Sequence, residues 1–254
     1  MIALRTPREI ELCSEASRIV AAVLELMGEM ARPGMTTGEM DAEAEALMRA
    51  MGAEPLWKGF RGYPGTICAS VNEEVVHGIP GERVLREGDI VSIDVGSRYR
   101  GYCGDSARTF AVGAVSSEAR RLLEVTERAL TAAIAKAVDG GRLSDISHAI
   151  QVEAEEAGFS VVRDYVGHGI GSAMHEEPQI PNFGPPGEGP KLRQGMILAI
   201  EPMVNAGGWQ VKLLDDGWTV VTADGGLSAH FEHEVAIMGD GPKVLSVLDD
   251  ESEV

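Results

Sequence analysis

Two aspartates, Asp94 and Asp105, flank a short turn within the stretch 89–109. They lie at mirror-image positions about a centre between Tyr99 and Arg100, so a tight hairpin there is expected to face one carboxylate with the other. Like charges directly opposite each other on paired strands are destabilising. A divalent metal ion removes this repulsion, because hard cations take carboxylate oxygens from several chain segments at once. The pattern predicts a metal site, although a single aspartate near a turn is usually just an exposed residue.

The apolar run Ile90, Val91 and Ile93 leads into Asp94, so this aspartate is expected to enter the protein body. Three more side chains share a position on or just beyond an apolar segment: His168 after 161–166, Glu201 after 196–200, and Glu232 within 231–237. Any one buried glutamate usually has a structural partner. Four gathered carboxylates would repel one another, however, and two divalent cations balance their charge formally. One imidazole among carboxylates favours Mn, Fe, Co or Zn.

A pair of such ions predicts hydrolysis. Together they can generate a hydroxide nucleophile near neutral pH and stabilise a tetrahedral oxyanion, which suits cleavage of an acyl or phosphoryl bond. Lys and Arg are missing around these motifs, so a phosphate ester is the less suitable substrate. The glycines around His168 lack the spacing of a phosphate-binding loop, and instead they let other groups approach the imidazole ring closely.

The remaining histidines differ in their surroundings. His77 and His175 lie in turns bounded by glycine and proline, where functional side chains are commonly presented. His230 and His233 flank Glu232, and a role as hydrogen-bond partners of metal ligands is as plausible as a purely structural one. His148 falls in the middle of an expected helix and is interpreted as a surface or packing residue.

The composition fits an ordinary globular chain: 254 residues, 44% hydrophobic and 24% charged. No apolar run is long enough for a bilayer, and the first residues do not resemble a secretory signal, so a cytoplasmic protein without membrane association is expected. Three cysteines at no metal-binding spacing agree with a reducing compartment. The net charge of −18 argues against strong nucleic-acid binding, and the acidic tail 249–254 is expected to be solvated.

The elements that position these residues repeat along the chain. Capping boxes at Thr6 and Thr36 predict two helices, and helical patterns return after Gly113 and at about 143–157. Strand-like segments follow each pair of helices. The halves 1–113 and 114–240 therefore both read helix, helix, strands, which predicts a single α+β domain over 1–254, built from a duplicated unit around a shared sheet.

Six motifs resemble those of the type I methionine aminopeptidases, metallopeptidases of the pita-bread fold. They are HGIP from His77, DIVSIDV with CGD, GHGIG around His168, MHEEPQ, IEPMV and FEHE, and the resemblance extends from about Thr6 to Ile237. It implies an α+β fold in which pseudo-twofold, duplicated helix-helix-strand units surround a curved, mainly antiparallel sheet.

The resemblance also implies the site. Two divalent metal ions, from among Co, Mn, Fe, Zn and Ni, would be held by Asp94, Asp105, His168, Glu201 and Glu232. Asp105 and Glu232 would bridge the ions, and Glu201 would also act as the proton shuttle. His175 would donate a hydrogen bond to the scissile carbonyl or its oxyanion, and His77 would contact the amide of the cleaved bond.

The substrate pocket of this family is apolar and aromatic. Phe60, Tyr63, Cys68 and Trp218 fall at matching places, and such a lining suits a polarizable thioether. Met174 precedes His175 where relatives often carry an aromatic residue, so the pocket is expected to differ on that side.

The predicted function is removal of the initiator methionine from nascent polypeptides with a small second residue, by a cytoplasmic monomer with, at most, a transient contact with the ribosome. One alternative is a proline-directed aminopeptidase or dipeptidase of the same fold. Another is a non-catalytic member that binds peptide or RNA, although the ligand set is complete and the net charge of −18 disfavours RNA.

Overall fold

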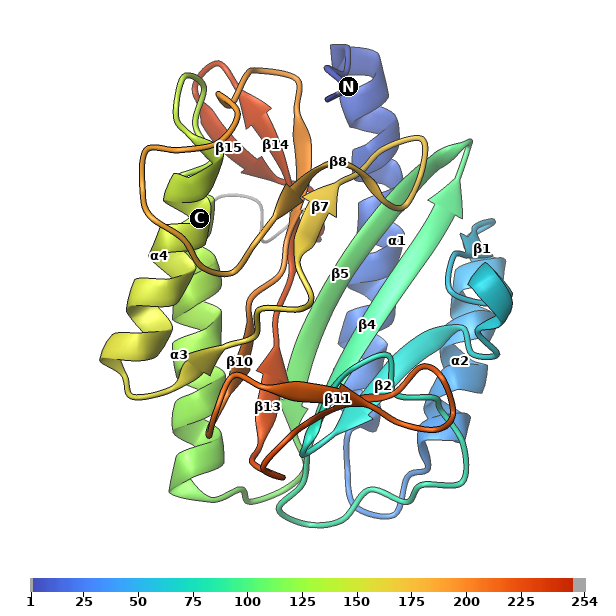
Figure 1. Ribbon diagram of the computed structural model, residues 1–254. Helices are drawn as coiled ribbons and strands as arrows, with labels where there is room; N and C mark the ends of the chain where they lie inside the picture. Colours follow the sequence, from blue (N-terminus) through green and yellow to red (C-terminus); the bar gives the residue numbers. More distant parts are fainter. Residues whose placement is uncertain (1, 249–254) are drawn as a thin grey trace.

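The computed structural model describes residues 2–248, so the predicted acidic tail at 249–254 lies outside the described residues. Four long helices occur in two pairs: α1 (Pro7–Met30) with α2 (Thr37–Ala50), and α3 (Ser117–Ile134) with α4 (Leu143–Glu156). In Figure 1, α3 and α4 stand on the opposite side of the molecule from α2, and α1 runs behind β4 and β5. The predicted order of two helices followed by strands is confirmed in both halves.

The helices begin where their capping residues predict. Thr6 accepts a hydrogen bond from the Glu9 N–H at 3.3 Å, and the Glu9 carboxylate accepts one from the Thr6 N–H at 2.9 Å. Thr36 and Glu39 repeat this reciprocal box at the start of α2. Each box satisfies backbone N–H groups that the first helical turn leaves unpaired.

The strands are short except for one long hairpin. The first half contains β1 (Glu54–Pro55), β2 (Ile67–Val71), β3 (Glu74–Val76), β4 (Ile90–Tyr99) and β5 (Tyr102–Ala111). The second half contains β6 (Ser160–Val161), β7 (Gly167–Gly169), β8 (Glu176–Ile180), β9 (Ile197–Ile200), β10 (Met203–Asn205), β11 (Val211–Leu213), β12 (Val220–Thr222), β13 (Ser228–His230), β14 (His233–Met238) and β15 (Gly241–Val244). The pairings between the described strands are antiparallel.

Strands from the two halves also pair directly. The β12 strand lies between β11 and β3, so a strand of the second half joins one of the first. The β10 strand pairs with β13 and β6, and β9 lies between β14 and β7 in the order β15-β14-β9-β7-β8. In this five-stranded order β14, β9 and β7 lie side by side, so three separate segments of the second half are adjacent in the sheet.

The predicted facing of Asp94 and Asp105 is wrong by a register shift. Asp94 lies opposite Ala107 and Asp105 opposite Gly96, so the two carboxylates are diagonal neighbours on one face. The hairpin turns at Arg100 and Gly101, whose φ angles of 49° and 86° are the left-handed pair that a two-residue turn requires. The centre of the hairpin is therefore one position later than predicted.

Three other predicted segments are less regular than expected. The predicted strand at 161–166 is reduced to the two-residue β6, and His168 lies within β7 rather than beyond a strand. Glu232 lies in the break between β13 and β14, not inside one strand over 231–237. The β-like segment after Trp57 begins with a short 3-10 helix, η1 (Phe60–Gly62).

Each half has its own apolar core. Buried residues of α1 and α2, including Val23 and Met48, pack with Ile93 of β4, while buried residues of α3 and α4 pack with those of β9 and β14. Met40 and Met48 of α2 are completely buried, whereas Met51 is 39% exposed. Cys13, Cys68 and Cys103 are buried free thiols. Among residues 2–248, none of the helices combines the length and apolar character needed to cross a membrane.

Candidate metal centre and active site

Three buried side chains converge where the two halves meet. One potential ligand atom from each of Asp105, His168 and Glu232 lies within 4.8 Å of the other two. Glu201 joins the group, because its Oε1 is 3.5 Å from His168 Nε2, which is itself 3.8 Å from Asp105 Oδ2. Asp94 is also buried and interacts with Asp105. The five predicted metal-ligating residues are thus in one cluster.

The sheet explains why residues so far apart in sequence meet. His168 of β7 pairs with Ala199 of β9, and β9 ends one residue before Glu201. On the other edge of β9, β14 begins one residue after Glu232. The Glu232 N–H donates to the Ala107 carbonyl of β5 at 2.8 Å, which joins this sheet to the hairpin that carries both aspartates.

Burial shifts the pKa values of these groups strongly. Burial raises the pKa of Asp94 to about 7, although the hydrogen bond from Trp57 opposes the rise. Burial, and then the neighbouring carboxylates, raise the pKa values of Asp105, Glu201 and Glu232 well above the usual range of carboxyl groups. Burial lowers the pKa of His168 to about 3, so its imidazole is neutral and able to bind a metal ion.

The hydrogen bonding of the cluster fits a bound cation. Asp105 Oδ1 and Glu232 Oε1 are buried and have no hydrogen-bond partner within residues 2–248. Buried carboxylate oxygens are normally paired with donors or coordinated to metals. The donor set of oxygens with one imidazole nitrogen suits a divalent transition metal. These residues could therefore hold a metal ion.

A cavity of about 100 Å³ opens onto the cluster. Trp57, His77, Tyr165, His175 and His230 line it together with the five acidic and imidazole groups. Sequence reasoning missed Trp57, whose indole N–H donates to Asp94 Oδ1 at 3.0 Å across a separation of 37 residues. Its only sequence signal was an aromatic residue at the start of a glycine-rich segment.

The predicted pocket residues gather beside this cavity. Tyr63, Cys68, Trp57 and Met174 form one buried cluster, and Phe60 and Trp218 pack against it. The Tyr63 hydroxyl is buried and can donate its single proton to the backbone carbonyl of Gly78 at 2.8 Å or to that of Ile67 at 3.1 Å. Met174 is buried in the wall, where the sequence indicated a difference from relatives.

The two histidines predicted to contact the substrate, His77 and His175, both line the cavity. The His175 ring centroid is 4.4 Å from that of His168 and 5.6 Å from that of Phe60. The His77 ring packs against Trp57, and the φ of His77 is 61°. Burial, and then the nearby His175, lower the pKa of His77 to about 4, while desolvation by the surrounding protein, and then the Arg61 charge, lower the pKa of His175. Both rings are therefore neutral at pH 7.

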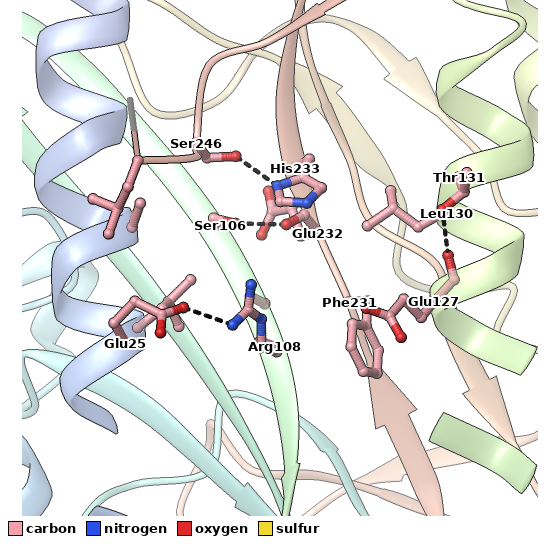
Figure 2. A pocket seen from close by; sticks show the side chains of 14 residues that line it. Glu25, Ser106, Arg108, Glu127, Leu130, Thr131, Phe231, Glu232, His233 and Ser246 are labelled. Carbon is pink, nitrogen blue, oxygen red and sulfur yellow. Dashed lines mark hydrogen bonds and ion pairs between the residues drawn. The ribbon is translucent and has the colours of Figure 1, made fainter. Parts of the chain in front are cut away.

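His230 and His233, which the sequence did not distinguish, have different surroundings. His230 is buried beside the cavity, with Nε2 3.7 Å from Glu201 Oε2. His233 Nδ1 instead lies 2.8 Å from Ser246 Oγ, as Figure 2 shows. In the same view Ser106 donates to the backbone carbonyl of Glu232 at 2.5 Å, which fixes the main chain behind this acidic residue. His148, on α4, lies 3.1 Å from the Gly184 carbonyl and outside the site.

Glu234 is a further buried carboxylate that sequence reasoning missed. Its Oε2 accepts hydrogen bonds from the Ser17 hydroxyl at 2.9 Å and from the Asp105 N–H at 3.2 Å. Burial raises the pKa of Glu234 to about 8. This side chain ties α1 to the strand that carries Asp105.

Comparison with known proteins places this site in a family. The sequence model of metallopeptidase family M24 matches residues 11–238 of this chain. Methionine aminopeptidase 1 of Bacillus subtilis is 54% identical over 246 residues, which cover 97% of this chain and 99% of that protein. The crystal structure of a methionine aminopeptidase from Thermotoga maritima has a TM-score of 0.96 and 46% identity, and covers 98% of this chain and 100% of that one. A prolidase from Pyrococcus furiosus shares the fold, with a TM-score of 0.79 and 24% identity, but only 66% of its chain is covered. The chain described above is a member of metallopeptidase family M24.

Proposed function

We propose that this chain is a methionine aminopeptidase, which removes the N-terminal initiator methionine from new polypeptides whose second residue is small. The supporting observation is the identity of 54% to a methionine aminopeptidase over 97% of the chain and 99% of that relative. The same level of coverage holds for the Thermotoga maritima structure. The proline-directed alternative is not favoured, since the prolidase is only 24% identical and is a longer chain.

Five residues would hold two divalent metal ions in this proposal: Asp94, Asp105, His168, Glu201 and Glu232. The convergence of their buried side chains and the unpaired oxygens of Asp105 and Glu232 support this assignment. When bound, the ions would supply Lewis-acid activation of water and of the scissile carbonyl group. Cobalt, manganese, iron, zinc and nickel are the candidates for the metal.

Glu201 would carry the proton of the reaction. Its Oε1 lies 3.5 Å from His168 Nε2, and the side chain lines the cavity. A carboxylate held within reach of the attacking water can accept its proton and return it to the leaving amine. His230, 3.7 Å from Glu201 Oε2, would restrict the orientation of this carboxylate.

His175 and His77 would bind the reacting amide. Both imidazoles are neutral at pH 7 because of their lowered pKa values, so each keeps one N–H donor and does not repel the cations. His175 would donate to the scissile carbonyl oxygen, and His77 would contact the amide of the cleaved bond. A donor aimed at the oxygen where charge develops stabilises the transition state more than the substrate.

The methionine side chain would occupy the pocket formed by Phe60, Tyr63, Cys68 and Trp218, with Trp57 and Met174 completing its wall. Aromatic rings and a thiol offer a thioether favourable dispersion contacts.

Residues 1–254 would act as one catalytic domain whose halves, 1–113 and 114–240, each contribute ligands. We expect the protein to act as a monomer in the cytoplasm on nascent chains, with transient contact with the ribosome.

The test compares peptides and metal states. Purified protein should cleave a peptide beginning Met-Ala, lose this activity after chelation, and regain it with Mn²⁺ or Co²⁺. A peptide beginning Ala-Pro should remain intact. E201Q should retain its fold by circular dichroism and lose turnover. Preferential cleavage of the Xaa-Pro peptide would favour a proline-directed enzyme, and an inert but folded wild-type protein that binds the Met-Ala peptide would favour a binding protein.

A further inference from the structure

The loop that ends at His175 is folded around one carboxylate. Glu176 Oε1 accepts hydrogen bonds from the Ser172 N–H at 2.9 Å, the Ser172 hydroxyl at 3.0 Å and the Ala173 N–H at 3.0 Å. Three donors from two consecutive residues therefore converge on a single oxygen. The conformation of residues 171–176 depends on where this carboxylate is held.

Arg5, far away in sequence, holds that carboxylate from the other side. Its Nη2 is 2.6 Å from Glu176 Oε1 and also contacts Oε2. The two side chains are only 11% and 17% exposed, so the ion pair is largely shielded from water. Shielded, charge-assisted bonds of this kind are stronger than exposed ones. A Cβ atom on Gly171 would lie 2.6 Å from Nε and Nη2, so the guanidinium lies directly against the loop backbone.

Both ends of this contact are fixed to rigid elements. The Arg5 N–H donates to the Gly195 carbonyl at 2.7 Å, just before β9, and the next residue, Thr6, caps α1. On the other side of the loop, the Cys103 N–H of β5 donates to the Gly171 carbonyl at 2.8 Å. The loop therefore lies between β5 and an arginine anchored beside β9 and α1.

The position of His175 depends on this anchoring. His175 directly precedes Glu176 in the chain, and the centroid of its ring lies 4.4 Å from that of His168. The residue lines the cavity and is partly open to solvent. We propose that Arg5 is a positioning residue for the reaction: it fixes Glu176 and so holds His175 at the cavity. The inference rests on the proposed function, in which His175 contacts the substrate carbonyl.

The shape of the arginine side chain matters for this contact. Nη2 of Arg5 contacts both oxygens of Glu176, and the planar guanidinium that fixes this nitrogen lies against the backbone of Gly171. A lysine at this position would keep the charge and one donor nitrogen but lose the planar group that packs against the loop. R5K should therefore restore part, but not all, of the ordering that R5A removes. The exposed Arg8, the second residue of α1, provides the matched control.

The test measures turnover and loop order separately. We expect R5A to lower kcat on a Met-Ala peptide about tenfold with KM changed less than about twofold, because a displaced donor weakens transition-state rather than ground-state contacts. R5K should fall between R5A and wild type, and R8A should match wild type. Hydrogen exchange of the Ser172 and Ala173 amides should be faster in R5A and unchanged in R8A. E176Q provides a second variant, which should weaken the same contact and lower kcat in the same direction.

Several results would overturn the proposal. One is an R5A protein that melts at a lower temperature but retains wild-type kcat at 25 °C, since Arg5 would then serve stability alone. Another is unchanged exchange at Ser172 and Ala173. The exchange measurement needs no substrate, so failure of the proposed function, seen as a wild-type protein inactive on Met-Ala, is distinguishable from failure of the Arg5 contact.

Discussion

Trp57 donates its indole N–H to Asp94 Oδ1 at 3.0 Å, while its ring forms part of the apolar wall beside the cavity. One side chain thus contacts both a candidate metal ligand and the candidate methionine pocket. Asp94 is buried with few other donors, so this hydrogen bond restricts its orientation. The acidic cluster and the apolar pocket are therefore coupled through Trp57.

The substitution W57F should weaken metal binding. Phenylalanine keeps an aromatic wall and removes the N–H, and loss of such a supporting hydrogen bond typically lowers metal affinity roughly tenfold or more. Titration of metal-free protein with Co²⁺ by calorimetry measures the change. W209F is the control, because Trp209 packs on Arg163 outside the cavity. Equal Co²⁺ affinity in W57F and wild type would show that the hydrogen bond does not orient Asp94.

His230 and His233 should differ in their contribution to activity. H230Q should lower kcat/KM by about tenfold, equivalent to about 1.4 kcal/mol, because it removes the imidazole whose Nε2 lies 3.7 Å from Glu201 Oε2. H233Q should leave kcat/KM almost unchanged and lower the free energy of unfolding by about 1 kcal/mol through the lost contact with Ser246. Steady-state kinetics and urea unfolding of both variants test this, and equal kinetic losses in the two would contradict it.

The sequence predicted the five candidate ligands because they lie on or beside apolar segments and within motifs that resemble those of the family, and the structure places their side chains in one cluster. It could not distinguish His230 from His233, because Glu232 lies in the break between two strands, where the alternation of faces is interrupted. The predicted centre of the hairpin was also wrong by one residue. Arg100 adopts a left-handed backbone conformation, which is uncommon for arginine and therefore could not be predicted from the residue type. The register of Asp94 and Asp105 followed from that turn.

The sequence also did not predict the contacts between residues that lie far apart in the chain. The bond from Trp57 to Asp94 and the ion pair of Arg5 with Glu176 join segments that no local pattern relates, and so does the contact of Glu234 with Ser17. Periodicity reports which face of an element is apolar, but it does not report which polar side chain on another element will meet it. The supporting residues of the site were therefore visible only in the folded chain.

Tyr63 should contribute to stability through its hydroxyl. The group is buried and donates to the Ile67 or Gly78 carbonyl, so Y63F should lower the free energy of unfolding by about 1 kcal/mol. The ring and its edge contact with Trp218 remain, so KM for a Met-Ala peptide should change little. Urea unfolding and steady-state kinetics give the two values. Y102F is the control, because the Tyr102 hydroxyl bonds to Glu9 near the surface; a larger loss there than in Y63F would contradict the prediction.

Glu176 should make stability depend on pH in the acid range. Burial alone would raise its pKa, but hydrogen bonds from Ala173, Ser172 and Arg5 outweigh that effect, and the pKa of Glu176 is lowered. A lowered pKa in the folded state means that ionised Glu176 stabilises the protein above its unfolded pKa of about 4.3, and that this contribution is lost as pH falls through the folded value. E176Q lacks the titrating group. The stability difference between wild type and E176Q should therefore be largest above about pH 5 and shrink on acidification. Urea unfolding of both proteins between about pH 3 and pH 7 measures it, with E177Q, at an exposed neighbour, as the control. A difference that stays constant across this range would mean that the charge of Glu176 does not stabilise the loop carrying His175.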